Sequence, residues 1–423
     1  MSAQAAADRL LVISSDGHVG PPVEAYRGYV DPEHRGAFED WLDAYVPMWV
    51  ATQTKESNLP ETLSERYKRE WMANDKVAEG AAGTWMPAQR LASMDADGIA
   101  ADVLFPDDQS ANSPPFLWFA REYNRPWDKE YTPALKLAGA RAYNRWLAEF
   151  CSAAPERLLG LALIGSMADV AGAVAEIRRA HADGLIGVLL PLIYYNSAEE
   201  PFWNDRRYDP IWATCAELGM AIHTHTGSGC PYYGDQPDGP ILYALECTMW
   251  PHRPLAFLVA GGVFERFPDL KLVMTEQGSG WVVESLMMMD HIVTDRMYAF
   301  GQQGHLSLKP SEYFRRQCWL GSSILSRPEV NMRHMIGVDK MMWGWDYPHI
   351  ESPDWLSPRE NLRALLAGLP LDEVRAIVGG NARHVYGLDA TKLGAIADQI
   401  GPRVAEIVSA QVPAAPHVLA QEQ

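Results

Sequence analysis

Two pairs of side chains in this 423-residue sequence have the types and the spacing of metal ligands. Asp16 and His18 are two residues apart in SDGHVG, and His223 and His225 are two residues apart in AIHTHTG. Because residues i and i+2 of a β-strand point to the same face, each pair can converge on one ion. Carboxylate and imidazole are both ordinary ligands of divalent transition metals. The two pairs therefore predict a metal site.

Two single carboxylates extend this predicted site. Glu276 in TEQGSGW and Asp346 in GWDYPH each follow a short apolar run. One such residue alone would usually be solvated, but here four separate runs end in possible ligands. Burying that many ionisable groups without a cation would be costly. We therefore predict the metal ligands Asp16, His18, His223, His225, Glu276 and Asp346.

Four other polar residues are weaker candidates. His349 follows Asp346 by three residues and is interpreted as a substrate contact, a residue supporting a ligand, or a surface histidine. The pair Asp107-Asp108 could line the site or cap a helix, and we favour the cap. His252 lies in a helical stretch, where a structural role is more common.

Eight short apolar runs must position these residues. They alternate with helix-like stretches, which is typical of buried parallel strands in repeated βαβ units. Eight such units predict an α/β fold, a (β/α)8 TIM barrel, in which the carboxyl ends of all strands meet at one mouth. A doubly wound sheet is the alternative, but no glycine-rich nucleotide motif follows any run. The runs are Leu10–Ser15, Ala100–Phe105, Leu158–Gly165, Leu185–Leu192, Met220–Thr226, Leu270–Thr275, Gln317–Gly321 and Lys340–Trp345.

The organisation along the chain predicts a single domain over residues 1–423. The stretch 24–97 is too long for a plain crossover and is rich in Trp and Tyr, so we interpret it as a helical insertion over the barrel mouth. Residues 390–423 are expected to form a C-terminal helical extension, with a flexible tail over residues 410–423.

Composition and charge exclude several classes of partner. Lys and Arg number 36 against 54 Asp and Glu, so the net charge of −18 opposes binding to nucleic acid or to an anionic membrane. No apolar run is long enough to span a bilayer. The five cysteines are widely spaced with no CxxC pair, which favours a reducing, cytoplasmic setting. We expect a small-molecule substrate and leave a homodimer open.

Five motifs resemble the amidohydrolase superfamily, in its branch of aminocarboxymuconate-semialdehyde and resorcylate decarboxylases. They are SDGHVGPP, AIHTHTG, GVFERFPDLKLVMTEQGSGW, GWDYPH and GGNARHVYGL. The resemblance implies a metal-dependent barrel enzyme with His18, His223 and Asp346 among its ligands. In two departures, Asp16 stands where the strand-one motif has its first histidine, and Glu276 stands where many members have histidine. The bridging lysine of binuclear members is also missing after the fourth run.

The leading interpretation is a metal-dependent hydrolase of a bulky carbonyl compound such as an amide or ester. One or two divalent ions (Zn, Mn or Fe) would activate water. Asp346 would carry its proton, with Glu276 and His349 as the other catalytic candidates. The added carboxylates shift the site toward Mn or Fe. They motivate an alternative, a nonheme di-iron monooxygenase, while the family branch motivates another, a non-oxidative decarboxylase. A non-catalytic binding protein is the last alternative.

Overall fold

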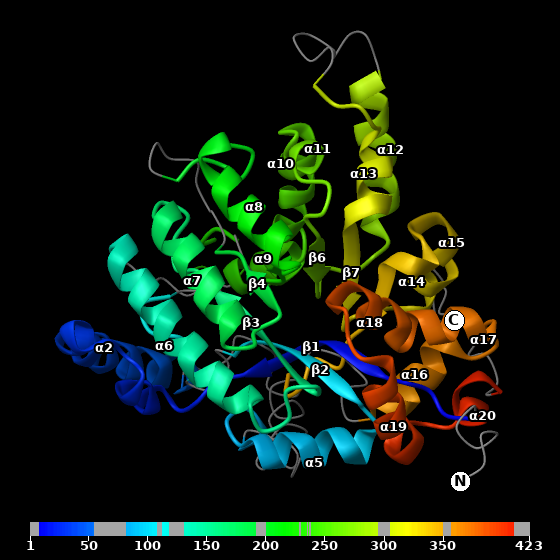
Figure 1. Cartoon of the computed structure of the whole chain (residues 1–423), viewed down its shortest axis with the longest axis horizontal. Coiled ribbons are helices and arrows are strands. Elements are labelled where there is room, and N and C mark those ends of the chain that lie inside the picture. The colour runs from blue at the N-terminus through cyan, green and yellow to red at the C-terminus, as the bar shows by residue number, and fades with distance from the viewer. Residues whose placement is uncertain are drawn as a thin grey trace.

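Eight parallel strands in chain order form the centre of the molecule, with helices around them (Figure 1). The computed structural model describes residues 8–54, 82–107, 112–117, 131–191, 200–227, 230–234, 236, 238–294, 305–349 and 357–409. The strands are β1 (Ile13–Val19), β2 (Ala101–Pro106), β3 (Leu158–Leu163), β4 (Gly187–Leu189), β5 (Ala221–His225), β6 (Leu272–Thr275), β7 (Cys318–Ser322) and β8 (Met341–Trp343). Each lies within or overlaps one of the eight apolar runs, so the predicted TIM barrel is confirmed.

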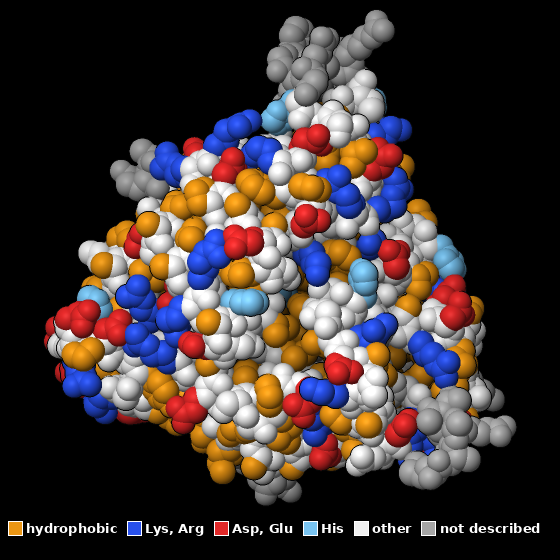
Figure 2. Space-filling model, viewed as in Figure 1, with side chains coloured by type: hydrophobic (Ala, Val, Ile, Leu, Met, Phe, Trp, Pro, Cys, Tyr) orange, Lys and Arg blue, Asp and Glu red, His pale blue; other side chains and the backbone are white. Residues whose placement is uncertain are grey.

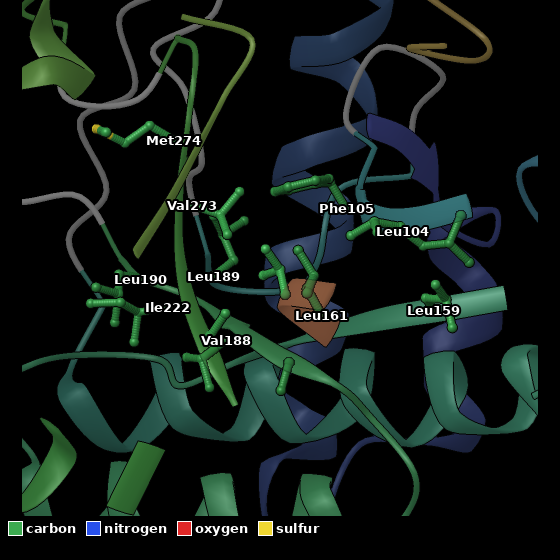
Figure 3. Packing of buried hydrophobic residues seen from close by; sticks show 14 of the residues in the cluster. Leu104, Phe105, Leu159, Leu161, Val188, Leu189, Leu190, Ile222, Val273 and Met274 are labelled. Carbon is green, nitrogen blue, oxygen red and sulfur yellow. The ribbon is translucent and has the colours of Figure 1, made fainter. Parts of the chain in front are cut away.

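The strands are short and almost wholly buried, because helices cover the outside of the sheet while side chains fill its inside. Aliphatic side chains of neighbouring strands lie next to one another in this buried cluster, as Val188 of β4 and Ile222 of β5, which are paired in register, do in Figure 3. The register is regular across β5 and β6, where His223 pairs with Val273 and His225 with Thr275. This regularity places the ends of β5 and β6 side by side.

The barrel closes where β1 meets the segment after β8. Gly17 and Tyr347 form a parallel bridge, and the amide of His18 donates to the carbonyl of Tyr347 at 2.7 Å. The pairing of β1 with β2 shifts register between Ser14 and Gly17. Strand β1 therefore continues through Asp16 and His18. The apolar run, in contrast, predicted that the strand would end before them.

The helices alternate with the strands and form an outer layer. They are α2 (Arg35–Thr54), α5 (Pro87–Asp97), α6 (Pro133–Cys151), α7 (Val170–Ala182), α8 (Asp209–Leu218), α9 (Gly239–Glu246), α10 (Arg253–Ala260), α11 (Val263–Arg266), α12 (Trp281–Thr294), α13 (Pro310–Gln317), α14 (Arg327–Asn331), α15 (Arg333–Ile336), α16 (Pro358–Leu366), α17 (Leu371–Arg375), α18 (Asn381–Tyr386), α19 (Ala390–Ile400) and α20 (Val404–Val408). Short 3-10 helices are η1 (Val23–Gly28), η2 (Pro32–His34), η4 (Arg206–Tyr208), η5 (Trp250–His252) and η6 (Val338–Lys340), and η7 (Ala376–Gly380) is a π-helical turn.

The described part of the stretch 24–97 is helical and has two different roles. Helix α2 packs on the loop after β2: the Tyr45 hydroxyl donates to Ser113 at 2.9 Å, and the ring centroids of Trp41 and Phe116 lie 6.2 Å apart. Helix α5 instead leads directly into β2 and ends at Gly98 (φ +83°), as a crossover helix of the barrel does. Residues 55–81 lie outside the described residues.

The C-terminal helical extension is confirmed as α19 and α20, whereas the tail over residues 410–423 lies outside the described residues. On the face shown in Figure 2, Lys and Arg side chains are interspersed with Asp and Glu. In the described part of the chain, none of the helices combines the length and the apolarity needed to cross a bilayer.

Candidate metal centre

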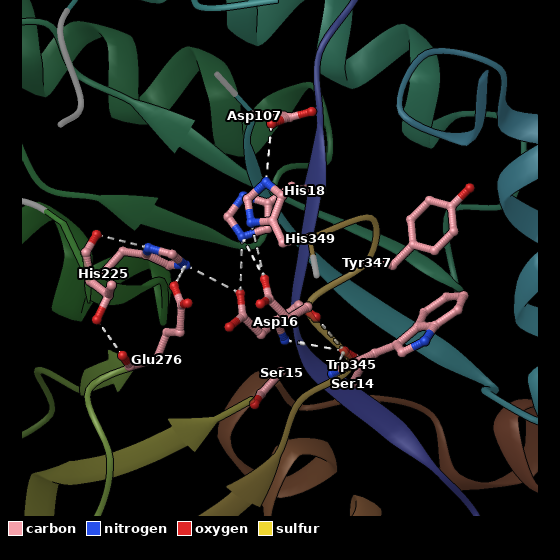
Figure 4. A network of polar contacts seen from close by, with 12 residues as sticks. Ser14, Ser15, Asp16, His18, Asp107, His225, Glu276, Trp345, Tyr347 and His349 are labelled. Carbon is pink, nitrogen blue, oxygen red and sulfur yellow. Dashed lines mark hydrogen bonds and ion pairs between the residues drawn. The ribbon is translucent and has the colours of Figure 1, made fainter. Parts of the chain in front are cut away.

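Carboxylate and imidazole groups from four strands converge at the mouth of the barrel (Figure 4). Two overlapping sets each bring their donor atoms within 4.8 Å of one another. The larger set lies on β1, on β5 and directly after β6, and the smaller set shares His18 and adds the segment after β8. The first set is Asp16, His18, His225 and Glu276; the second is His18, Asp346 and His349.

The backbone fixes which ring nitrogen of each histidine faces the cluster. His18 Nδ1 lies 3.0 Å from the carbonyl of Pro106, and His225 Nδ1 lies 3.2 Å from that of Thr226. A carbonyl only accepts, so each Nδ1 carries the proton and donates. When such a ring is neutral, its Nε2 carries a lone pair, which is the form that binds a metal.

These lone pairs point at carboxylates. His18 Nε2 lies 3.2 Å from Asp346 Oδ1, and His225 Nε2 lies 3.3 Å from both Asp16 Oδ1 and Glu276 Oε2. Lone pairs this close repel unless a proton or a cation lies between them.

Two of these buried atoms also lack a hydrogen bond. Within the described residues, Asp16 Oδ2 and Asp346 Oδ2 have no hydrogen-bond partner, and the contacts of Asp346 Oδ1 are with the ring nitrogens of His18 and His349. Leaving buried charged atoms unpaired is costly. The donors present therefore fit a divalent cation.

Glu276 and Asp346 both have positive φ angles, +58° and +59°. Left-handed backbone is strained for residues other than glycine, and such strain is concentrated at functional sites. Each residue is held by a strand-like hydrogen bond: the amide of Glu276 donates to Gly321 at 2.7 Å, and that of Asp346 donates to Asp16 at 2.8 Å. The turn at each strand end directs a carboxylate into the mouth.

His349 lies between two carboxylates and stacks on His18, with ring centroids 3.8 Å apart. Its Nε2 is 3.1 Å from Asp107 Oδ1 and its Nδ1 is 3.3 Å from Asp346 Oδ1. Burial acts to lower the pKa of His349, but Asp346 and Asp107 raise it well above its usual value. Burial acts to raise the pKa of both carboxylates, but His349 lowers each below its usual value.

His223 is the one predicted ligand that the structure does not bring into the cluster. Its Nε2 lies 3.1 Å from the hydroxyl of Tyr386, and its Nδ1 lies 3.4 Å from the carbonyl of Val188. Burial lowers its pKa to about 3, so the ring is neutral. His223 has the contacts of a core histidine, because it sits one strand repeat deeper than His225, which ends β5 at the mouth.

Asp107 is the position whose contacts the sequence interpretation missed. It was expected to cap a helix, yet it is fully buried and accepts hydrogen bonds from His349 and from Asn112 Nδ2 at 2.8 Å. Asp107 directly follows β2, so the strand-end rule that selected Glu276 could have selected it too. Asp108 lies outside the described residues. His252 stacks on Trp281 at 3.7 Å, consistent with its expected structural role.

Single substitutions of the two histidines of β5 distinguish the histidine that binds metal from the histidine that packs in the core. We expect His225→Ala to weaken Mn²⁺ binding by at least the roughly 10–100-fold that the loss of an outer-shell partner causes. His223→Gln should leave Mn²⁺ affinity near that of the parent protein. It should lower the free energy of unfolding by about 1–3 kcal/mol, because one amide group cannot reach both the Val188 carbonyl and the Tyr386 hydroxyl as the two ring nitrogens do. Calorimetric titration with Mn²⁺ and urea unfolding measure the two effects, and loss of Mn²⁺ binding in His223→Gln would contradict this assignment.

The metal-free protein should lose stability as the pH rises above neutral. The raised pKa of His349 means that its contribution is fully present below its ordinary value of about 6.5 and is lost as the pH rises through the folded-state pKa. The lowered pKa values of Asp107 and Asp346 mean that theirs is present above about 3.8 and is lost on acidification. Urea unfolding in EDTA across this range, compared with His349→Gln, checks the alkaline limb. An equal alkaline loss in His349→Gln would show that His349 is not its source.

Comparison with known proteins identifies the family of this chain and supports its fold. The family model described as Amidohydrolase matches residues 83–388. The chain is 26% identical over 208 residues to decarboxylase orsB of Emericella nidulans, covering 46% of this chain and 59% of that protein. It is 28% identical over 226 residues to gamma-resorcylate decarboxylase of Rhodococcus jostii, covering 49% and 66%. The matched regions thus span less than two thirds of each relative.

Two solved structures illustrate the shared fold. Amidohydrolase map2389c of Mycobacterium avium subsp. paratuberculosis aligns with a TM-score of 0.64 and 21% identity, over 90% of this chain and 99% of that one. A dihydroxybenzoic acid decarboxylase of Polaromonas sp. JS666, solved with bound manganese and the inhibitor 2-nitroresorcinol, aligns with a TM-score of 0.58 and 19% identity, over 90% and 98%. At these identities the likeness establishes the barrel, and a manganese site on this fold agrees with the predicted cofactor class.

Proposed function

The chain belongs to the amidohydrolase family, and on that premise we propose that it is a metal-dependent, non-oxidative decarboxylase of a small hydroxylated aromatic acid. The observation that carries the proposal is the buried cluster of carboxylate and imidazole donors at the barrel mouth, in which Asp16 Oδ2 and Asp346 Oδ2 have no hydrogen-bond partner among the described residues. Both curated relatives are named decarboxylases, which favours this chemistry over the hydrolysis expected from the sequence.

The proposed ligand set keeps five of the six predicted residues and leaves out His223. A bound divalent cation would act as a Lewis acid, holding an anionic oxygen of the substrate and stabilising negative charge as it develops. Three carboxylates with two imidazoles suit Mn or Fe better than Zn. The set is Asp16, His18, His225, Glu276 and Asp346.

Decarboxylation breaks the bond between the ring carbon and the carboxylate. Its electron pair stays on the ring carbon, carbon dioxide leaves, and that carbon gains a proton that comes ultimately from water. Asp346 is proposed to pass this proton on, because its carboxylate is buried and faces the cluster, and its Oδ2 has no hydrogen-bond partner among the described residues. His349 would orient Asp346 through the 3.3 Å contact to Oδ1, and Asp107 would hold His349 from its other side.

A paired substrate screen tests this proposal. Mn²⁺-loaded protein is incubated with benzoates that carry a hydroxyl next to the carboxylate, and with the methyl esters and amides of the same rings. We expect carbon dioxide and the decarboxylated phenol from one or more free acids, with the esters and amides left intact. Release of methanol or ammonia from the esters or amides, without carbon dioxide from the acids, would restore the hydrolase interpretation.

The overlap of two donor sets supports one second candidate, a dinuclear nonheme iron monooxygenase. His18 belongs to both sets, and the surplus of carboxylates could hold a second ion. Carboxylate-rich dinuclear iron sites occur on other folds. Two irons per chain, together with a strict requirement for oxygen, would favour this candidate over the decarboxylase.

A further inference from the structure

One fully buried arginine lies behind the metal centre and belongs to none of its donor sets. Arg90 is in the first turn of α5 and is 0% exposed, as is its partner Asp102 on β2. Its Nη2 and Nε lie 2.7 and 3.2 Å from Asp102 Oδ2. Taking a guanidinium and a carboxylate out of water is costly, so a fully buried pair is weak evidence that the pair exists for stability.

The other contacts of Arg90 connect the two segments that carry metal ligands. Nη1 donates to the carbonyl of His18 at 3.1 Å and to the carbonyl of Tyr347 at 3.3 Å. The guanidinium also lies 4.3 Å from the centre of the Tyr347 ring. One side chain thus binds β1 within its Asp16–His18 motif and the segment after β8 next to Asp346.

The barrel is irregular at this same place. The β1 register shifts between Ser14 and Gly17, and β1 joins the segment after β8 through the Gly17–Tyr347 bridge. Gly17 leaves the space that the ion pair fills, since a Cβ there would lie 2.6 Å from Asp102 Oδ2 and also collide with Arg90 Nη2. A planar guanidinium with five donors can satisfy two carbonyls and a carboxylate at once, which the ammonium group of lysine cannot match.

We infer that Arg90 is a positioning residue of the metal centre. It fixes Asp16 and His18 on β1 relative to Asp346 and His349, at the place where β1 meets the segment after β8 and closes the barrel. This inference rests on the proposed metal centre. Removing Arg90 would leave every ligand present but would free the two segments to move relative to each other. The geometry of the ligands would then change, and the metal affinity would fall, even in molecules that stay folded.

The test compares Arg90→Met and Arg90→Lys with a matched control, Arg157→Met. Arg157 also binds α5, through Asp95 at 2.7 Å, and donates to the carbonyls of Ile99 and Ala100. Its acceptors precede β2, and none of them belongs to the cluster. For each folded variant, Mn²⁺ affinity is measured by calorimetry, the electron paramagnetic resonance spectrum of bound Mn²⁺ is recorded, and thermal unfolding is followed in EDTA.

We expect Arg90→Met to weaken Mn²⁺ binding by roughly 10–100-fold and to change the Mn²⁺ spectrum. Arg90→Lys should recover part of the affinity, whereas Arg157→Met should lower only the unfolding temperature. If Arg90→Met does not fold, an unchanged affinity and spectrum in Arg90→Lys would overturn the inference. Wild-type affinity in folded Arg90→Met would overturn it while leaving the metal centre intact. A parent protein that binds no Mn²⁺, Fe²⁺ or Zn²⁺ would overturn both.

Discussion

Replacing Asp346 by Asn should lower turnover by roughly the 10²–10⁴-fold that a positioned acid–base group supplies. An amide has nearly the same shape and keeps one oxygen facing the cluster, but it cannot take up and pass on a proton. Asp346 is fully buried and lies next to both His18 and His349, so water cannot easily replace it as proton carrier. Steady-state turnover at saturating Mn²⁺ measures the effect separately from any loss of metal affinity.

The matched control for this substitution is Asp389→Asn. Asp389 caps α19 through the amides of Thr391 and Lys392, outside the donor cluster. It should lose a little stability and no turnover. If metal-loaded Asp346→Asn turns over as fast as the parent protein, Asp346 is not the proton carrier, and the roles proposed at the barrel mouth must be reassigned.

Removing the metal should reduce turnover to background, and adding Mn²⁺ back should restore it. The cluster without a cation holds opposed lone pairs and unpaired carboxylate oxygens, so the cation is expected to stabilise the fold as well. At a Mn²⁺ concentration about 100 times the dissociation constant, that linkage contributes about 2.7 kcal/mol. Chelation, dialysis and metal titration, followed by both turnover and thermal unfolding, measure the two effects.

His225→Ala provides the control for metal removal. It should need far more Mn²⁺ to recover turnover, while Asp389→Asn should respond like the parent protein. Full turnover from chelated protein with no detectable metal would exclude metal-dependent chemistry of any kind at this site.

The strand pattern and most of the predicted cluster could be found from the sequence alone. Buried parallel strands are short apolar runs, and the ends of parallel strands meet at one mouth. That rule alone brings together Asp16, His18, Glu276 and Asp346.

The sequence could not predict how deep in the barrel each side chain of a strand lies. His223 and His225 share a face, but only the one that ends β5 reaches the mouth, and the end of a strand is uncertain by a residue or two in any sequence. The burial of Arg90 could not be predicted from the sequence either, because a buried arginine in an amphipathic helix has the same local sequence as an exposed one.

The choice of reaction was beyond the sequence for another reason. Carboxylate and imidazole ligands around a divalent ion serve hydrolysis, decarboxylation and oxygenation alike. Asp16 and Glu276, which stand where the family motifs have histidine, change the preferred metal, but they do not indicate which bond of the substrate breaks. The names of the relatives supply the preference for decarboxylation, and only product analysis can test it in this chain.

The most direct test of the central claim follows the carboxyl carbon and the new proton together. A hydroxybenzoate that the screen identifies is labelled with ¹³C in its carboxylate and incubated with Mn²⁺-loaded protein in D₂O, under argon and under ¹⁸O₂. The proposal predicts equal amounts of ¹³CO₂ and phenol, one deuterium at the carbon that held the carboxylate, and the same rate with or without oxygen. Turnover that requires oxygen and places ¹⁸O in the product, or that leaves the ¹³C carboxyl attached to the ring, would contradict it.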